Sequence, residues 1–319
     1  MRYAKRLGWV AMPNYRSSHK VPTPRGGGIA MAFVFFVAVA VLWLAEFVAK
    51  ELALAFIGGG LMVSVVSFID DRKNVHVGIR LAVQFIAVAW ALFFIGDMTR
   101  MNLGWRFWYL DFFTHLVPLG MVWMINMYNF MDGIDGLAGS EAVMAGGAGG
   151  ALLAAAGAWD LALISWVVAA VSAGFLIWNW PPAKIFMSDV GSILIGFIFI
   201  VLAVASERSG AMPLLSWLIL LMVFVVDATF TTIRRFVKGE QWFAGHHNFG
   251  FQQFLKKGYS HKQVTLGIIA VNVALAGLAL IAWWKPVLLT PFFLGSLLIL
   301  AVVWWKVQRI TPDTHVHLP

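Results

Sequence analysis

Long apolar stretches, separated by short polar connections, run through almost the whole of this chain. Ten such stretches can be distinguished, at residues 27–49, 52–69, 79–96, 113–128, 137–158, 160–179, 190–205, 213–229, 264–284 and 286–305. Most are close to the ~20 residues that a helix needs to cross the ~30 Å hydrocarbon core of a bilayer. The pattern therefore predicts about ten transmembrane helices.

The composition places the chain among membrane proteins. Of 319 residues, 61% are hydrophobic and 12% are charged, whereas soluble domains carry about 25% charged residues. We expect an all-α, polytopic membrane protein in which residues 1–319 form a single domain. Residues 1–26 are basic and lack an apolar core, so they are predicted as a cytoplasmic segment and not a signal peptide. Residues 230–262 are predicted as a cytoplasmic loop, with a short amphipathic helix on the membrane as an alternative for part of it.

The distribution of basic residues predicts the orientation. If the N-terminus is cytoplasmic and ten helices alternate, 18 of the 23 lysines and arginines lie on the cytoplasmic side and 5 on the other. This asymmetry follows the positive-inside rule. The net charge of +8 is therefore explained by topology and by attraction for anionic lipids and nucleotides, and nucleic acid is not expected as a partner.

The same orientation places several aspartates at the cytoplasmic face, namely Asp70, Asp71, Asp132, Asp135 and Asp189. Ionisable groups near a bilayer are costly and usually have a task. Neighbouring carboxylates such as Asp70 and Asp71 suit Mg²⁺, which takes one or two carboxylates together with waters and substrate phosphates. A solvated loop with local ion pairs is the alternative for this pair. Together the acids predict a metal and phosphate site at one face.

The run from Asn126 to Leu137 carries polar residues at a spacing of three, in the order Asn126, Asn129, Asp132, Asp135. The first two would share one helix face. Glycines at 133 and 136 are expected to loosen the helix and to let a ligand approach the backbone. Helix capping is the alternative. Elsewhere, the Gly58–Gly60 triplet and the small residues of 145–158 are predicted to permit close helix packing.

Two further segments complete the candidate site. Asp189 opens the seventh stretch, where it could cap the helix or coordinate a cation, and Phe186 could stack on a base or anchor in the interface. His246 and His247 lie in a basic loop suited to a pyrophosphate or a developing phosphoryl charge, and idle solvated histidines are the alternative. Zinc is not expected, because the chain has no cysteine and no histidine and glutamate spacing typical of metalloproteases.

These motifs occur in a diagnostic order: Pro22-Thr23-Pro24-Arg25, then Asp70-Asp71, then the Asn126 to Leu137 run, then Met187-Ser188-Asp189. In this order they resemble the polyprenyl-phosphate N-acetylhexosamine-1-phosphate transferases (glycosyl transferase family 4), over about residues 2–265. The segments 15–19 and 238–242 look most similar to the branch that initiates O-antigen and teichoic-acid synthesis.

The resemblance implies an enzyme of the bacterial inner membrane with its active site facing the cytoplasm. It would transfer a sugar 1-phosphate from a UDP-N-acetylhexosamine to undecaprenyl phosphate, releasing UMP, with Mg²⁺ or Mn²⁺ as cofactor. Membrane lipids and a second copy of the chain are further expected partners. By motif, the residues of the reacting centre would be Asp70, Asp71, His246 and His247. Substrate-binding residues would be Lys20, Arg25, Asn126, Asn129, Asp132, Asp135 and Phe186. The metal ligands would be Asp189 and Asp71.

The chain departs from the family pattern in three places. Ser188 stands where glycine is common, Phe249 stands near where a second loop histidine is usual, and relatives carry one more helix before the Pro22 turn. Two other functions remain as alternatives. A CDP-alcohol phosphotransferase would share the Asp132-Gly133-Ile134-Asp135-Gly136 run but lacks its further residues here, and a lipid or sugar transporter would place polar groups near the membrane midplane.

Overall fold

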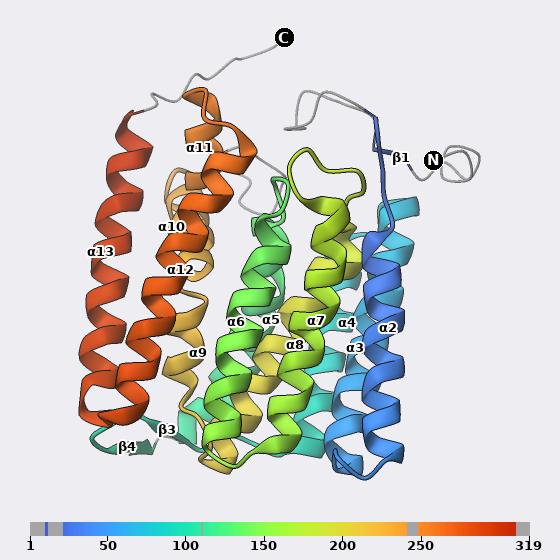
Figure 1. Ribbon diagram of the computed structural model, residues 1–319, viewed down its shortest axis with the longest axis vertical. Helices are drawn as coiled ribbons and strands as arrows, with labels where there is room; N and C mark the ends of the chain where they lie inside the picture. The colour runs from blue at the N-terminus through green and yellow to red at the C-terminus, as the bar shows by residue number, and fades with distance from the viewer. Residues whose placement is uncertain (1–9, 12–21, 110, 241–247, 311–319) are drawn as a thin grey trace.

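Helices account for nearly all of the structure, a computed structural model that describes residues 10–11, 22–109, 111–240 and 248–310 (Figure 1). The helices are α2 (Gly27–Leu44), α3 (Lys50–Lys73), α4 (Val77–Ile95), α5 (Asp111–Met131), α6 (Leu137–Ala155), α7 (Trp159–Asn179), α8 (Ser188–Ser209), α9 (Leu214–Leu220), α10 (Met222–Val237), α11 (Gly250–Lys256), α12 (His261–Trp284), η1 (Pro286–Leu288) and α13 (Leu289–Ile310). Two short antiparallel strand pairs join β1 (Val10–Ala11) to β2 (Thr23–Pro24) and β3 (Arg100–Asn102) to β4 (Phe107–Tyr109). The all-α prediction is confirmed.

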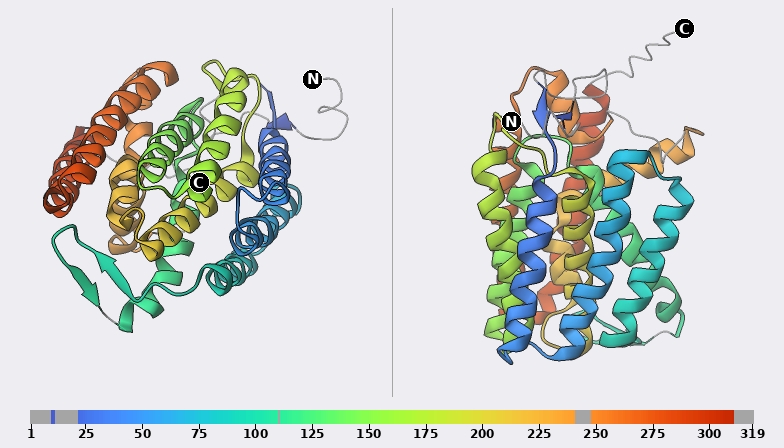
Figure 2. Two further views of the ribbon diagram at one scale, coloured as in Figure 1. Left: turned by 60° about the horizontal axis from the view of Figure 1, so that its bottom comes forward. Right: turned by 90° about the vertical axis from the view of Figure 1, so that its right-hand side faces the viewer.

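The prediction of a polytopic membrane protein is confirmed, but not the count of ten spans. Within the described residues, eight helices are long and apolar enough to cross a membrane, or nine if α9 and α10 together count as one span. The stretch 213–229, predicted as one helix, is bent by 83° between α9 and α10. As a result, α10 leaves the axis of the bundle (Figure 2). It continues to Val237, so the first residues of the predicted loop 230–262 are helical.

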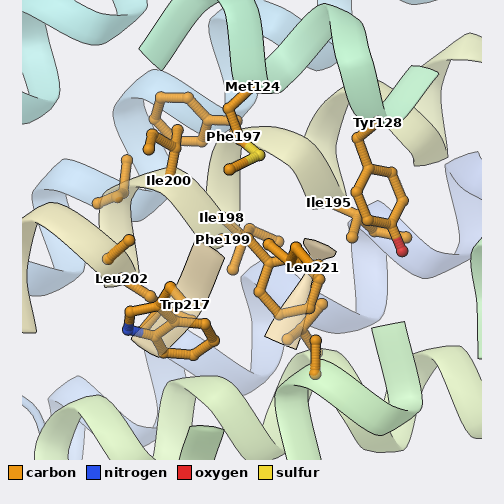
Figure 3. Packing of buried hydrophobic residues seen from close by; sticks show 14 of the residues in the cluster. Met124, Tyr128, Ile195, Phe197, Ile198, Phe199, Ile200, Leu202, Trp217 and Leu221 are labelled. Carbon is orange, nitrogen blue, oxygen red and sulfur yellow. The ribbon is translucent and has the colours of Figure 1, made fainter. Parts of the chain in front are cut away.

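The central helix of the bundle is α8. In α8, 89% of the spanning residues are buried, compared with 67% or less in every other candidate span. A helix that is apolar all round lies either in a protein core or in the lipid of a membrane, and for α8 it is neighbouring helices that cover most of the surface. Figure 3 shows this arrangement, in which Phe199 of α8 contacts Tyr128 of α5 and Trp217 of α9, each with ring centroids 5.9 Å apart.

Charged residues occur in α8 only at its two ends. Near its C-terminus, Glu207 accepts hydrogen bonds from the backbone N–H groups of Asn102 (2.8 Å) and Leu214 (2.7 Å), which ties the connecting segments to the bundle. At the other end, Asp189 lies in the first turn. We call the end of the bundle where α3 ends and α8 begins the site end; it is the upper end in Figure 1.

Glycines let α8 approach its neighbours closely, as the sequence predicts for small residues. A Cβ added to Gly59 of α3 would lie 2.4 Å from the ring of Phe197. At the site end the contact is between backbones: a Cβ on Gly28 of α2 would lie 2.3 Å from the nitrogen of Gly191 and 2.5 Å from the carbonyl oxygen of Met187. The start of α2 is therefore held directly against the start of α8.

This contact predicts the effect of a single methyl group. Gly28→Ala should lower the free energy of unfolding by about 1–3 kcal/mol, because backbone atoms cannot move aside as flexible side chains do. Thermal unfolding of the purified protein in detergent measures the loss. Gly267→Ala in α12 is the control, because a Cβ there meets nothing within 4 Å, and its stability should be unchanged or slightly higher. Equal unfolding temperatures for Gly28→Ala and the native chain would contradict this packing.

Candidate active site

Carboxylates from two different helices meet at the site end. Asp71 lies near the C-terminal end of α3, and Asp189 lies in the first turn of α8. The Asp71 carboxyl is hydrogen-bonded by the Ser188 hydroxyl and the backbone N–H of Asp189. Asn129, from the last turns of α5, donates from Nδ2 to Asp189 Oδ1 at 3.0 Å and to Ser192 Oγ at 2.9 Å. Residues separated by about sixty positions in sequence thus form one polar centre.

Ser188 explains a departure noted in the sequence. Its φ is +58°, in the left-handed region that favours glycine. A glycine would adopt this conformation at lower cost, which is a physical reason for glycine being common at this place. The serine offsets the strain in part, because its hydroxyl bonds the Asp71 carboxyl. The departure therefore changes a contact of the site as well as the local backbone.

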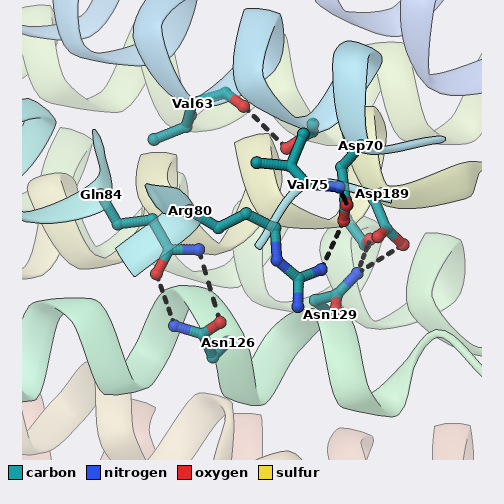
Figure 4. A network of polar contacts seen from close by, with 10 residues as sticks. Val63, Asp70, Val75, Arg80, Gln84, Asn126, Asn129 and Asp189 are labelled. Atoms are coloured by element: carbon teal, nitrogen blue, oxygen red, sulfur yellow. Dashed lines mark hydrogen bonds and ion pairs between the residues drawn. The ribbon is translucent and has the colours of Figure 1, made fainter. Parts of the chain in front are cut away.

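Asp70 is turned toward a different partner from Asp71. One of its carboxylate oxygens pairs with Arg80 Nη1 of α4, and the other accepts the Val75 backbone N–H at 2.7 Å (Figure 4). Both oxygens are therefore engaged within the protein. Arg80 also interacts electrostatically with Asp189. Asp70 thus holds the Arg80 guanidinium beside the centre formed by Asp71 and Asp189.

A short parallel bridge forms one wall of the site. The Phe186 N–H donates to Pro24 O at 2.9 Å, and the N–H groups of Gly27 and Gly28 donate to Phe186 O at 3.1 Å and Met187 O at 2.9 Å. This pairing fixes Arg25 next to the start of α8. Arg25 is exposed, and its charge acts on both Asp71 and Asp189. It is therefore placed to meet an anionic ligand.

The connection between α5 and α6 brings a third carboxylate. Burial, followed by the negative charges of Asp189, Asp71 and Asp135, raises the pKa of Asp132 from 3.8 to about 7. Burial disfavours the ionised carboxylate, and the neighbouring negative charges add to this effect. The centre therefore has an excess of negative charge that a bound cation would relieve.

The two glycines of this connection serve protein contacts. A Cβ on Gly133 would lie 2.6 Å from the Phe251 ring. Gly136 has a φ of +77°, and a Cβ added there would lie 3.1 Å from Pro181 Cδ. The admission of a ligand to the backbone at these positions stays a prediction. They let the turn pack against α11 and against the α7–α8 connection.

Asp135 anchors the turn between α5 and α6. Its Oδ2 accepts the Ala183 N–H at 3.0 Å and lies 3.3 Å from Nδ1 of His261, the first residue of α12. Its carbonyl accepts a hydrogen bond from the Thr265 hydroxyl at 3.0 Å. Deeper in the same interface, Asn272 of α12 donates to the buried Glu141 of α6. One face of α12 therefore braces the turn that carries Asp132.

Asn126 lies one turn deeper in the bundle than Asn129. Its amide donates to Gln84 Oε1 at 2.6 Å and to Val122 O at 2.8 Å, and it accepts from Gln84 Nε2 at 3.4 Å. Gln84 is almost completely buried. In the structure this pair joins α4 to α5 below the candidate site.

The predicted metal ligands Asp71 and Asp189 form a small carboxylate set. In the part of the chain that the structure describes, no group of three His, Cys, Asp or Glu side chains is arranged to hold a metal ion. Asp71 and Asp189 provide two adjacent carboxylates, with Asp132 nearby. This donor set fits Mg²⁺ bound jointly with substrate phosphates, because Mg²⁺ keeps several waters and takes few protein ligands.

Some predicted residues lie outside the described part of the chain, namely Lys20, His246 and His247. Other residues of the site were missed by the sequence analysis, above all Arg80 and His261. Arg80 and Gln84 are polar residues four apart in an otherwise apolar helix, and that spacing is a signal that could have identified the polar face of α4. Nothing in the local sequence pairs His261 with Asp135, because they are 126 positions apart.

Comparison with known proteins finds similarity over the segment that carries these site residues. The model of glycosyl transferase family 4 matches residues 53–207, which include Asp70, Asp71, Asn129, Asp132 and Asp189.

Among similar proteins, a probable undecaprenyl-phosphate N-acetylglucosaminyl 1-phosphate transferase of Bacillus subtilis (strain 168) is 27% identical over 313 residues, covering 93% of this chain and 84% of the relative. A decaprenyl-phosphate N-acetylglucosaminephosphotransferase of Mycobacterium tuberculosis (strain ATCC 25618 / H37Rv) is 29% identical, with coverages of 94% and 82%. An undecaprenyl-phosphate alpha-N-acetylglucosaminyl 1-phosphate transferase of Escherichia coli (strain K12) is 28% identical, with coverages of 97% and 88%. The family match and these similarities agree with the resemblance of the sequence motifs to glycosyl transferase family 4.

Proposed function

We propose that this protein transfers the sugar 1-phosphate of a UDP-N-acetylhexosamine to undecaprenyl phosphate, forming undecaprenyl-diphospho-sugar and releasing UMP. The product would initiate a cell-envelope polysaccharide. The observation that carries the proposal is the meeting of Asp71, Asp189 and Asn129 at one end of a membrane bundle. The names of the relatives given above support the transfer of N-acetylglucosamine 1-phosphate to a polyprenyl phosphate.

The arrangement suits phosphoryl transfer, which depends mostly on positioning and charge neutralisation. Asp71 and Asp189 would hold Mg²⁺ or Mn²⁺, which when bound neutralises charge on the diphosphate. Asn129 keeps Asp189 in orientation, and Ser188 does the same for Asp71. Arg25 lies at the wall of the site, where it would bind a phosphate oxygen.

The acceptor needs little activation. A phosphate monoester has a second pKa near ~6, so the lipid phosphate is largely ionised at neutral pH. Asp70 is paired with Arg80 in the structure, which favours a role in positioning that cation over a role as general base. A direct displacement and a covalent aspartyl-phosphate route both remain compatible with this geometry. The stereochemical outcome at a chiral phosphorus distinguishes them, because one displacement inverts and two retain.

The distribution of charge supports a site at the cytoplasmic face of the inner membrane. The basic residues of the opposite end are Lys50, Arg100, Arg106, Arg208 and Lys285. The other described lysines and arginines belong to the site end. This asymmetry is that of the positive-inside rule.

The decisive experiment is UMP release by the purified protein with undecaprenyl phosphate, Mg²⁺ and a panel of UDP-N-acetylhexosamines. Asp71→Asn and Asp189→Asn should each lower kcat by roughly 100-fold or more, because loss of several kcal/mol of charge stabilisation costs about tenfold per ~1.4 kcal/mol. Asp97→Asn, at an exposed aspartate outside the site, is the control and should retain full activity. Absence of UMP release with every sugar would reject the proposal in favour of a transporter or a CDP-alcohol phosphotransferase.

A second experiment tests the link between Asp70 and Arg80. Asp70→Asn and Arg80→Gln should each reduce turnover, and the double variant should lose little more than the worse single one. The expected coupling is about 0.5–3 kcal/mol, as for directly interacting residues. Turnover is measured for all four proteins at saturating substrate. Near-normal turnover of Asp70→Asn would remove Asp70 from the mechanism.

The charge excess around Asp132 predicts a pH-dependent effect of Mg²⁺ on stability. The folded-state pKa is about 7 and the ordinary value is 3.8, so ionisation in the folded protein is resisted, and stability falls as pH rises through this window. A cation at the site would offset this repulsion. The increase in unfolding temperature on adding Mg²⁺ should therefore be larger at pH 8 than at pH 6, by roughly 2–4 °C for each 1 kcal/mol recovered.

Asp132→Asn provides the control for this measurement. It removes one titrating group and should reduce the difference between the two pH values, and the remainder belongs to Asp71, on which the negative charge of Asp189 also acts. A buffer in which Na⁺ replaces Mg²⁺ at the same ionic strength separates specific Mg²⁺ binding from screening of charge by salt. An equal Mg²⁺ effect at both pH values in the native chain would contradict the assignment of the charge excess to Asp132.

A further inference from the structure

A large groove lies between α2 and α7, outside the polar centre of the site. Its volume is about 1360 Å³, and most of its lining is apolar. The depth comes from small residues on both walls, including Ala38 on α2 and Ala170 and Gly174 on α7. Because both helices are candidate membrane spans, hydrocarbon chains are the molecules that this groove meets.

The groove reaches through about one leaflet. It extends along α2 from Gly27 to Ala38, which at 1.5 Å per residue is about 16 Å. The hydrocarbon core of a bilayer is ~30 Å thick. A lipid of the leaflet at the site end would therefore fill the groove with its chain and place its headgroup at the mouth.

The mouth of the groove is cationic. Arg25 and Lys184 line it, and none of the lining residues is acidic. Arg25 also acts on the carboxylates of the site, whereas Lys184 lies over Trp178, with Nζ 5.7 Å from the centroid of its ring. Trp178 is 58% exposed, as is typical of tryptophan at the level of the lipid headgroups. The mouth therefore combines an interfacial aromatic residue with charge complementary to a phosphate.

We propose that the α2–α7 groove binds an anionic phospholipid of the bilayer, with an acyl chain along Gly174 and the phosphate at Lys184. The acceptor polyprenyl phosphate shares this chemistry, but its chain is much longer than a groove that ends near the middle of the membrane. A lipid bound here would brace α2 against α7, and thus the bridge between Arg25 and Phe186 that forms a wall of the site. The proposal does not rest on the proposed reaction.

The chain offers a substitution that fills the groove without disturbing its walls. A Cβ added to Gly174 meets nothing within 4 Å, and the same holds for Gly267 of α12, which does not line the groove. Gly174→Leu should therefore exclude the acyl chain, while Gly267→Leu serves as a matched control in another membrane helix. Lys184→Gln removes the charge at the mouth and leaves the apolar walls intact.

Binding is measured by native mass spectrometry of the full-length protein in detergent, with phosphatidylglycerol, phosphatidylcholine of the same acyl chains, and undecaprenyl phosphate as separate probes. The native chain and Gly267→Leu should retain one phosphatidylglycerol, with affinity roughly five-fold or more above that for phosphatidylcholine. Gly174→Leu should weaken phosphatidylglycerol binding by roughly five-fold or more relative to the native chain. Lys184→Gln should abolish most of the preference for phosphatidylglycerol over phosphatidylcholine.

Three outcomes would overturn the proposal. Phosphatidylglycerol binding by Gly174→Leu equal to that of the native chain would show that the groove is not the site. Equal binding of the two phospholipids by the native chain would remove the role of charge. Displacement of phosphatidylglycerol by undecaprenyl phosphate, together with loss of undecaprenyl phosphate binding in Gly174→Leu, would assign the groove to the acceptor. UMP release is scored separately, so failure of the reaction and failure of the lipid site are distinguishable.

Discussion

The cost of placing charge in a membrane governs this structure. The most buried helix, α8, is apolar along its whole length and carries acidic residues only in its first and last turns. There the carboxylates are held by hydrogen bonds, Asp189 by Asn129 and Glu207 by two backbone amides. Negative charge near a helix N-terminus is favoured by the free amides and the helix dipole. The position of Asp189 is thus compatible with burial of the remainder of the helix.

The site is assembled around this end of α8 by close contacts between helices. Gly28 and Gly191 bring α2 against α8 backbone to backbone, so that Arg25 stands beside Asp189. On the opposite side, α12 presents His261, Thr265 and Asn272 along one face. The first two bond Asp135 and hold the turn of Asp132 in place. The polar centre therefore depends on contacts made by the first turns of α2 and α12, two helices that contribute no group to the reaction themselves.

Arg25 connects the two sites described above. It interacts with Asp71 and Asp189 on one side and lines the α2–α7 groove on the other. The backbone bridge to Phe186 fixes its position. A lipid in the groove and a phosphate at the carboxylate centre would therefore both act on the same short segment, which is held between α2 and the start of α8.

The sequence by itself determined the membrane class, the extents of most helices and the polar residues of the site end, because apolar length and isolated carboxylates are properties of local sequence. It did not separate Asp70 from its neighbour Asp71, although one pairs with Arg80 and the other faces Ser188. It also predicted one straight helix where α9 and α10 bend by 83°, and it gave no sign that Phe251 packs at Gly133. Those features were decided only by the tertiary structure. Each depends on which side chain a distant helix brings into contact, and a local pattern of apolar and polar residues carries no record of that neighbour.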